Sequence, residues 1–242
     1  MKSWEIRLAE LNPRQKAERI AALFRERRQI DILPDELMPP DLGEAYKIRA
    51  AFEAVETARG RGAVAGYKIG LTTPIMQKLC GVDEPCYGAI FASEVHHRRA
   101  ELAVKSYCRL GIETEIAVRL GEDLRHDYKR LSAAAMVAGN VWNAGAVIGT
   151  PATDWRRLDL ASVTARLTID GGEIGNGKGG DVMGNPLNAL AWLAGKLAAA
   201  GTPLRRGMIV LTGSMVPIQF PSASDHALVE VEGLGTAELA AT

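Results

Sequence analysis

The stretch 111–120, GIETEIAVRL, constrains the fold of this chain more than any other. Its β-branched residues predict a strand, and residues two apart in a strand point to the same face. Glu113 and Glu115 therefore share one face. Two carboxylates held this close repel each other unless they are protonated, solvated or bridged by a cation. A hard divalent ion such as Mg²⁺ or Mn²⁺ favours these oxygen ligands. The alternative is a solvated strand face that carries two ordinary glutamates.

Length and charge limit the class of protein. The chain has 242 residues, of which 47% are hydrophobic and 24% charged, enough for one well-buried domain with a small N-terminal appendage. Lys plus Arg and Asp plus Glu are equal at 29 each, so bulk charge indicates neither a nucleic-acid nor a membrane partner. Charged residues interrupt any signal peptide near the start, and no apolar run is long enough for a membrane span. We expect a cytoplasmic protein.

The cysteine count indicates reduced thiols. The chain has three cysteines, Cys80, Cys86 and Cys108, and an odd number gives no disulfide framework. Their spacing matches no zinc-binding pattern, and nothing pairs one of them with a particular histidine as a catalytic thiol.

The order of predicted elements favours an α+β fold. Residues 1–62 read as a helical N-terminal region, with a proline-containing linker at 31–42 and a helix at 42–59. Residues 63–242 read as a β-rich catalytic domain. Strands are predicted at 64–71, 89–92, 111–120, 163–170, 208–211 and 227–231, and helices follow Thr72 or Thr73 and cover 186–200. Because most strand connections look like hairpins, we expect a mostly antiparallel or mixed β core rather than a doubly wound sheet.

Three charged residues are candidates for proton handling. Lys68 lies in the middle of a predicted interior strand, so it reaches solvent, a carboxylate or a bound anion. It either extends to the surface or holds a substrate carboxylate and moves protons. Asp83 and Glu84 lie in a loop bounded by glycine and proline, where they are either solvated turn residues or part of a site.

Polar residues in two apolar stretches are candidates for substrate binding. Asn140 and Asn143 flank Val-Trp, and their amides need partners from the backbone or from a ligand. Thr212 and Gly213 follow a predicted buried strand. A turn at a strand end can present a hydroxyl and backbone N–H groups to an anion, although an ordinary turn has the same residues.

Six motifs in register resemble one family. They are GYKIGLT (66–72), GVDEP (81–85), ETE (113–115), NVWNAG (140–145), NPLNALAWL (185–193) and LTGS (211–214). Together they are similar to the 2-keto-4-pentenoate hydratase family of the fumarylacetoacetate-hydrolase superfamily. That family includes 2-hydroxypenta-2,4-dienoate hydratases and 4-oxalocrotonate decarboxylases of aromatic meta-cleavage pathways. The resemblance extends from about residue 8 to the C-terminus.

The resemblance implies a fold, a reaction and a site. It implies a core of the fumarylacetoacetase C-terminal-domain type, a homo-oligomer and a possible complex with another enzyme of the pathway. The expected activity is hydration of a 2-hydroxy-2,4-dienoate to a 4-hydroxy-2-oxo acid, with a related decarboxylation as the alternative. The implied Mg²⁺ or Mn²⁺ is held by Glu113 and Glu115. Lys68 matches the family's active-site lysine, and Asp83 and Glu84 assist it. The residues implied to bind substrate are Leu71, Asn140, Asn143, Thr212 and Gly213.

Three departures from the family pattern leave a third alternative open. The family's third acidic metal ligand lies in a segment that is missing here between Leu124 and Arg125, and Glu122, Asp123 and Asp127 match it poorly. Cys86 and Gly139 each stand where the family usually has Asp. A non-catalytic member of the family would also have these features.

Overall fold

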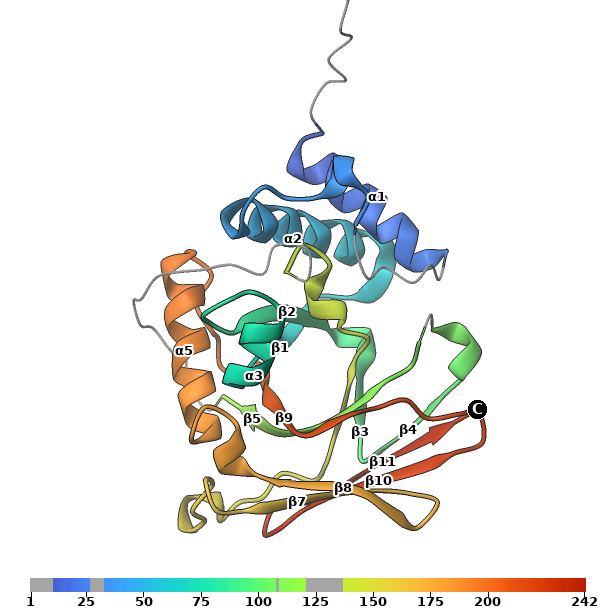
Figure 1. Ribbon diagram of the computed structural model, residues 1–242, viewed down its shortest axis with the longest axis vertical. Coiled ribbons are helices and arrows are strands. Elements are labelled where there is room, and N and C mark those ends of the chain that lie inside the picture. The colour runs from blue at the N-terminus through green and yellow to red at the C-terminus, as the bar shows by residue number, and fades with distance from the viewer. Residues whose placement is uncertain (1–10, 27–32, 108, 121–136) are drawn as a thin grey trace, which may run out of the picture.

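The computed structural model describes residues 11–26, 33–107, 109–120 and 137–242. Its helices are α1 (Pro13–Arg25), α2 (Leu42–Glu56), α3 (Pro74–Leu79) and α5 (Pro186–Ala199). Its strands are β1 (Val64–Gly70), β2 (Cys86–Phe91), β3 (Val95–His97), β4 (Arg99–Leu102), β5 (Ile112–Arg119), β6 (Ala146–Ile148), β7 (Thr164–Ile169), β8 (Gly172–Lys178), β9 (Ile209–Gln219), β10 (His226–Val231) and β11 (Gly235–Ala241). Helices α1 and α2 lie at one end of the molecule, and β7, β8, β10 and β11 lie at the other (Figure 1).

Helix α2 follows the prediction closely. The Asp41 side chain accepts a hydrogen bond from the Glu44 N–H, and this cap sets the start of the helix at Leu42. The α-helix ends at Glu56, and one π-helical turn continues it from Thr57 to Arg61. Gly62, with φ 83°, then lets the chain turn into β1.

A mixed four-stranded sheet forms the centre of the protein, with strand order β2-β1-β9-β5. Strand β1 is antiparallel to β2 and parallel to β9, and β9 is antiparallel to β5. The prediction placed the strand after the Asp83–Glu84 loop at 89–92, but β2 begins at Cys86. It starts earlier because Cys86 pairs with Gly70 at the end of β1.

A second sheet of five strands has the order β4-β11-β10-β7-β8, and β3 pairs with β6. The turn between β7 and β8 uses Asp170 and Gly171, both with positive φ, a pair that favours a tight hairpin. Helices segregated from mixed sheets confirm the α+β fold class. The division at residue 62 stays a prediction.

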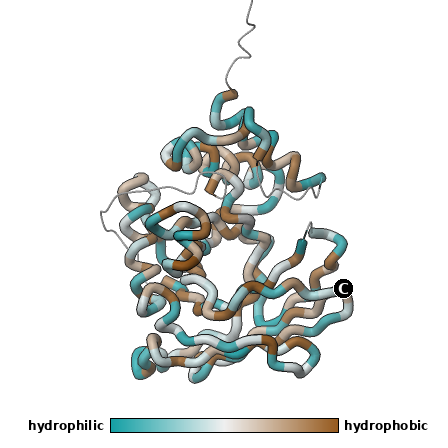
Figure 2. The backbone as a smooth tube through the Cα atoms, viewed as in Figure 1, coloured by the Kyte–Doolittle hydropathy of each residue, from teal (hydrophilic) through white to brown (hydrophobic). Residues whose placement is uncertain are grey.

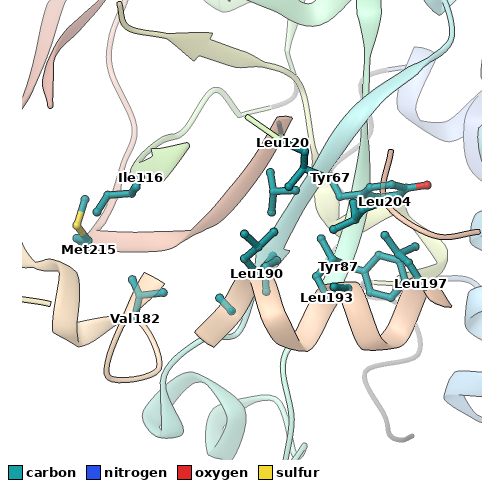
Figure 3. Packing of buried hydrophobic residues seen from close by; sticks show 14 of the residues in the cluster. Tyr67, Tyr87, Ile116, Leu120, Val182, Leu190, Leu193, Leu197, Leu204 and Met215 are labelled. Atoms are coloured by element: carbon teal, nitrogen blue, oxygen red, sulfur yellow. The ribbon is translucent and has the colours of Figure 1, made fainter. Parts of the chain in front are cut away.

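Helix α5 covers one face of the central sheet. Leu190, Leu193 and Leu197 point from this helix toward Tyr67 and Tyr87 on β1 and β2 (Figure 3). All five side chains are buried in one hydrophobic cluster. Since neighbouring residues of a strand face opposite sides, the residues next to these tyrosines lie on the other face of the sheet.

Hydrophobic and hydrophilic residues alternate along most helices and strands (Figure 2), as expected for elements with one buried side. In the part of the chain that the structure describes, no helix combines the length and apolarity that crossing a membrane requires.

Candidate active site

Lys68, Glu113 and Glu115 lie on the face of the central sheet that is turned away from α5. Tyr67 and Ile69 pack in the cluster with α5, so Lys68 between them faces the other side. Ile116 belongs to the same cluster, which places Glu115 on the face of Lys68. The Lys68 ammonium donates a hydrogen bond to Glu113 Oε2, and this ion pair joins β1 to β5. The structure therefore brings together three of the predicted residues, and we call this side of the sheet the site face.

Burial and charge determine the protonation of these groups. Lys68 is 9% exposed. Burial lowers its pKa, but the charges of Glu113 and Glu115 outweigh burial and raise the pKa above its usual value, so the ammonium is retained. For Glu115 the balance is reversed, because burial and the charge of Glu113 raise its pKa to about 7 despite the nearby Lys68. One ammonium does not neutralise two carboxylates.

Thr212 and Gly213 donate hydrogen bonds as expected, but they lie within strand β9 and not in a turn. The sequence placed these residues in a turn after a strand ending at Leu211, whereas β9 continues to Gln219. The pairing register between β5 and β9 shifts here, as in a β-bulge. The bulge lets the Gly213 N–H donate to Glu115 Oε2 at 2.5 Å, and the Thr212 hydroxyl donates to the Ile116 carbonyl at 2.9 Å.

Thr72 is a site neighbour that the sequence did not single out as one. Thr73 caps α3 by accepting from the Met76 N–H, which frees Thr72 from that role. Thr72 is buried against Gly213: a Cβ added to Gly213 would lie 2.5 Å from Thr72 Oγ1. Leu71, a predicted substrate-binding residue, precedes it with a φ of 56°, a conformation that costs energy for a non-glycine residue. The signal that could have identified Thr72 is its place in the GYKIGLT motif, which also contains Lys68.

Asn140 and Asn143 both bind the backbone of β2. The Asn140 amide accepts from the Ala89 N–H and donates to the Ala89 carbonyl at 2.9 Å, and Asn143 donates to the same carbonyl at 2.9 Å. Asn140 and Val141 both have positive φ. The sequence left open whether the two amides bind the backbone or a ligand, and in the structure they bind the backbone. These hydrogen bonds hold residues 140–143 against β2, the strand that pairs with β1 and its Lys68.

Asp83 and Glu84 are not gathered with Lys68 and the two glutamates. Asp83 is exposed, and Glu84 pairs with Lys196 on α5. Cys86, by contrast, is fully buried, and its thiol interacts electrostatically with Lys68. Burial raises the pKa of Cys86 to about 12, so this residue is a neutral thiol where a carboxylate would carry charge.

The donor set on the site face suits a divalent cation. Lys68 donates to one oxygen of Glu113, and Gly213 donates to one oxygen of Glu115. Among the described residues no donor binds the other oxygen of either carboxylate, so these oxygens can serve a metal. Mg²⁺ is commonly held by one or two carboxylates, with water and substrate oxygens completing the shell. No cluster of three or more His, Cys, Asp or Glu side chains suited to a metal is found among the described residues. Glu122, Asp123, Asp127 and the Leu124–Arg125 junction lie outside those residues.

Comparisons with known proteins give relatives of this chain by sequence and by fold. A scan against protein-family models finds no match. The 2-keto-4-pentenoate hydratase of Paraburkholderia phymatum is 34% identical over 251 residues, covering 91% of this chain and 95% of the relative. That aligned stretch is longer than this chain of 242 residues, so the relative has residues without a counterpart here.

Two solved structures support the fold. The 4-oxalocrotonate decarboxylase of Pseudomonas putida G7, complexed with magnesium and adipate, has a TM-score of 0.87 at 21% identity, covering 95% of this chain and 97% of that one. A putative fumarylacetoacetate hydrolase family protein of Yersinia pestis has a TM-score of 0.54 at 18% identity, covering 73% and 92%. They confirm the predicted fold type. By its sequence identity over nearly its whole length, the chain belongs to the 2-keto-4-pentenoate hydratase family.

Proposed function

We propose that this protein is a metal-dependent hydratase that adds water to a 2-hydroxy-2,4-dienoate and forms a 4-hydroxy-2-oxo acid. The observation that carries the proposal is the grouping of Lys68, Glu113 and Glu115 on the site face. Membership of the hydratase family supports the same reaction. In this proposal the pathway is aromatic meta-cleavage and the substrate is of the 2-hydroxypenta-2,4-dienoate type.

Glu113 and Glu115 would hold the divalent cation, Mg²⁺ or Mn²⁺, each through the carboxylate oxygen that no described residue binds. When bound, the cation supplies Lewis-acid stabilisation of negative charge at the 2-oxo group. The Gly213 N–H orients Glu115, and Thr72 packs behind Gly213. Lys68 holds a proton at Nζ beside Glu113, and the proposal assigns to it the exchange of this proton with the substrate.

The substrate-binding roles of Leu71, Asn140, Asn143, Thr212 and Gly213 are part of the proposal. Asn140 and Asn143 support it indirectly, since they fix the chain that packs on the site face. A role for Asp83 in proton handling stays part of the proposal, although this residue is exposed and is not gathered with Lys68. A homo-oligomer, and a complex with another enzyme of the pathway, are expected from the family resemblance and are tested by light scattering.

Turnover assays test the reaction directly. Purified protein is given a 2-hydroxydienoate and, separately, a 2-oxo-hexenedioate, with and without Mg²⁺ or Mn²⁺. We expect metal-dependent loss of the dienol absorbance with water addition. Lys68→Met should abolish this turnover, whereas Lys47→Met, which alters an exposed lysine on α2, should retain it.

Two results would contradict the hydratase assignment. Release of CO₂ without water addition would assign the decarboxylase alternative. Absence of turnover with both substrates, together with no detectable metal binding, would identify a non-catalytic member of the family. The mass of the intact protein shows whether its sequence is continuous between Leu124 and Arg125.

A further inference from the structure

The chain between β1 and β2, residues 71–85, lies beside the site face at both of its ends. We call it the β1–β2 segment. At its start Thr72 packs against Gly213, which donates to Glu115. At its end Pro85 leads into Cys86, which interacts electrostatically with Lys68. The position of this segment therefore affects both the metal-binding carboxylate and the surroundings of the lysine.

Most hydrogen bonds of the β1–β2 segment stay within it. The Gln77 amide donates to the Leu71 carbonyl, Thr73 caps α3, and the Val82 N–H donates to the Gln77 carbonyl. Among the described residues, Glu84 is the one member of the segment whose side chain forms hydrogen bonds or an ion pair with the rest of the protein.

Helix α3 adds little apolar attachment. Ile75 is 79% exposed and Leu79 is 76% exposed, so the helix does not bury these large side chains against the described part of the protein. The members that pack inward are Leu71, Thr72, Val82 and Pro85. A segment held by so few buried groups depends strongly on any additional anchor.

Glu84 is anchored on α5. The Lys196 ammonium lies 2.8 Å and 3.1 Å from the two Glu84 carboxylate oxygens, and both side chains are only 12% exposed. Trp192, one turn earlier in α5, also hydrogen-bonds Glu84, and its ring lies 5.8 Å from the Lys196 ammonium. Removing one partner of a pair this buried leaves the other charge poorly compensated.

We infer that Lys196 is a positioning residue that acts through Glu84 to fix the β1–β2 segment beside the site face. Glu84 then serves as an anchor on α5 and not as a proton-transfer group. This inference goes beyond the proposed function and rests on it only for the effect on turnover. The attachment itself is a property of the folded chain and is measured without substrate.

The first experiment measures the attachment by proteolysis. Lys78 is exposed on α3, so trypsin cleavage after Lys78, followed by mass spectrometry, reports opening of the segment. Lys196→Met and Glu84→Gln should each accelerate this cleavage about tenfold relative to the wild type. Lys47→Met, which breaks the exposed Lys47–Glu44 pair, is the matched control and should not change it. Unchanged cleavage in Lys196→Met would overturn the inference.

The second experiment separates positioning from proton transfer. For an anchor, the two single variants lower kcat/KM to a similar extent, and the double variant is no worse than either. The double variant that exchanges the pair, Glu84→Lys with Lys196→Glu, then recovers part of the lost kcat/KM. The acidic and basic limbs of the profile of kcat/KM against pH stay unchanged. If Glu84 transfers protons instead, Glu84→Gln removes one pH limb while Lys196→Met retains kcat, and the inference fails. A wild type without turnover would defeat the proposed function alone, since the cleavage result would stand.

Discussion

Lys68 on β1 and Glu113 on β5 are 45 positions apart in the sequence, and their side chains meet across the intervening strand β9. Glu115 lies close enough to raise the Lys68 pKa together with Glu113. The three side chains carry two negative charges and one positive charge when all are ionised. This excess of negative charge favours the divalent cation that we propose for the site face.

Replacing either glutamate by glutamine should weaken metal binding. Glu113→Gln and Glu115→Gln keep the side-chain shape and remove an anionic ligand. Mg²⁺ or Mn²⁺ should raise the Tm of the wild type by mass action and raise that of each variant much less. The measurement is a thermal melt with and without metal, and Glu101→Gln on β4, an exposed position, is the control. Equal metal-induced shifts in all four proteins would rule out the metal site.

Metal binding should tighten as pH rises toward neutrality. Burial raises the pKa of Glu115 from 4.5 to about 7, so a proton competes with the metal below that value. Between pH 4.5 and about pH 7, Glu115 of the metal-free protein keeps its proton in the folded state and has lost it in the unfolded state. This group's contribution to stability therefore falls as pH rises from 4.5 to about 7. Calorimetric titration with Mg²⁺ between about pH 5 and about pH 8 measures the affinity, and a pH-independent affinity would contradict this assignment.

Gly213→Ala should damage both stability and metal binding. Gly213 has a φ of 119°, and an added Cβ would lie 2.5 Å from Thr72 Oγ1. We expect a loss of about 2 kcal/mol or more in the free energy of unfolding, from strain and overpacking together. Gly201→Ala is the control, because its φ is 75° but no heavy atom lies within 4 Å of the added Cβ. Denaturant melts should show a larger loss for Gly213→Ala, with a reduced metal-induced shift.

Asn140→Ala should destabilise the protein by about 1–3 kcal/mol, because the Ala89 N–H loses its side-chain partner in a buried position. Asn176→Ala removes an exposed hydrogen bond to Glu173 and should cost little. Urea denaturation of both variants compares them. A small loss for Asn140→Ala would indicate that its amide contributes little to holding residues 140–143 on β2.

The strand that bears the two glutamates could be predicted because its pattern is local. Alternation along 111–120 places Glu113 and Glu115 on one face whatever lies on either side of the strand. The pairing of Lys68 with Glu113 could not be derived in this way, since it depends on the insertion of β9 between β1 and β5. The resemblance to the family predicted that Lys68 and the two glutamates belong to one site, whereas residue patterns alone did not.

Two site features escaped prediction for physical reasons. The end of the predicted strand at Leu211 followed from a Thr-Gly-Ser sequence typical of turns, but pairing with β5 carries β9 through a bulge instead. Glu84 is in a motif that suggests a site residue, and its sequence neighbours give no sign of Lys196, 112 positions away. Long-range partners of this kind are set by tertiary packing.

The parallel pairing of β1 with β9 also determines when the site can form during folding. Gly66 pairs with Ile209, and the Gly213 N–H reaches Glu115 over a separation of 98 residues. Closing such large loops costs entropy before any contact repays it, which makes this topology slow to assemble. The two glutamates that we propose as metal ligands therefore acquire their partners only after β9 has been placed, so recovery of metal affinity after denaturation should report completion of the central sheet.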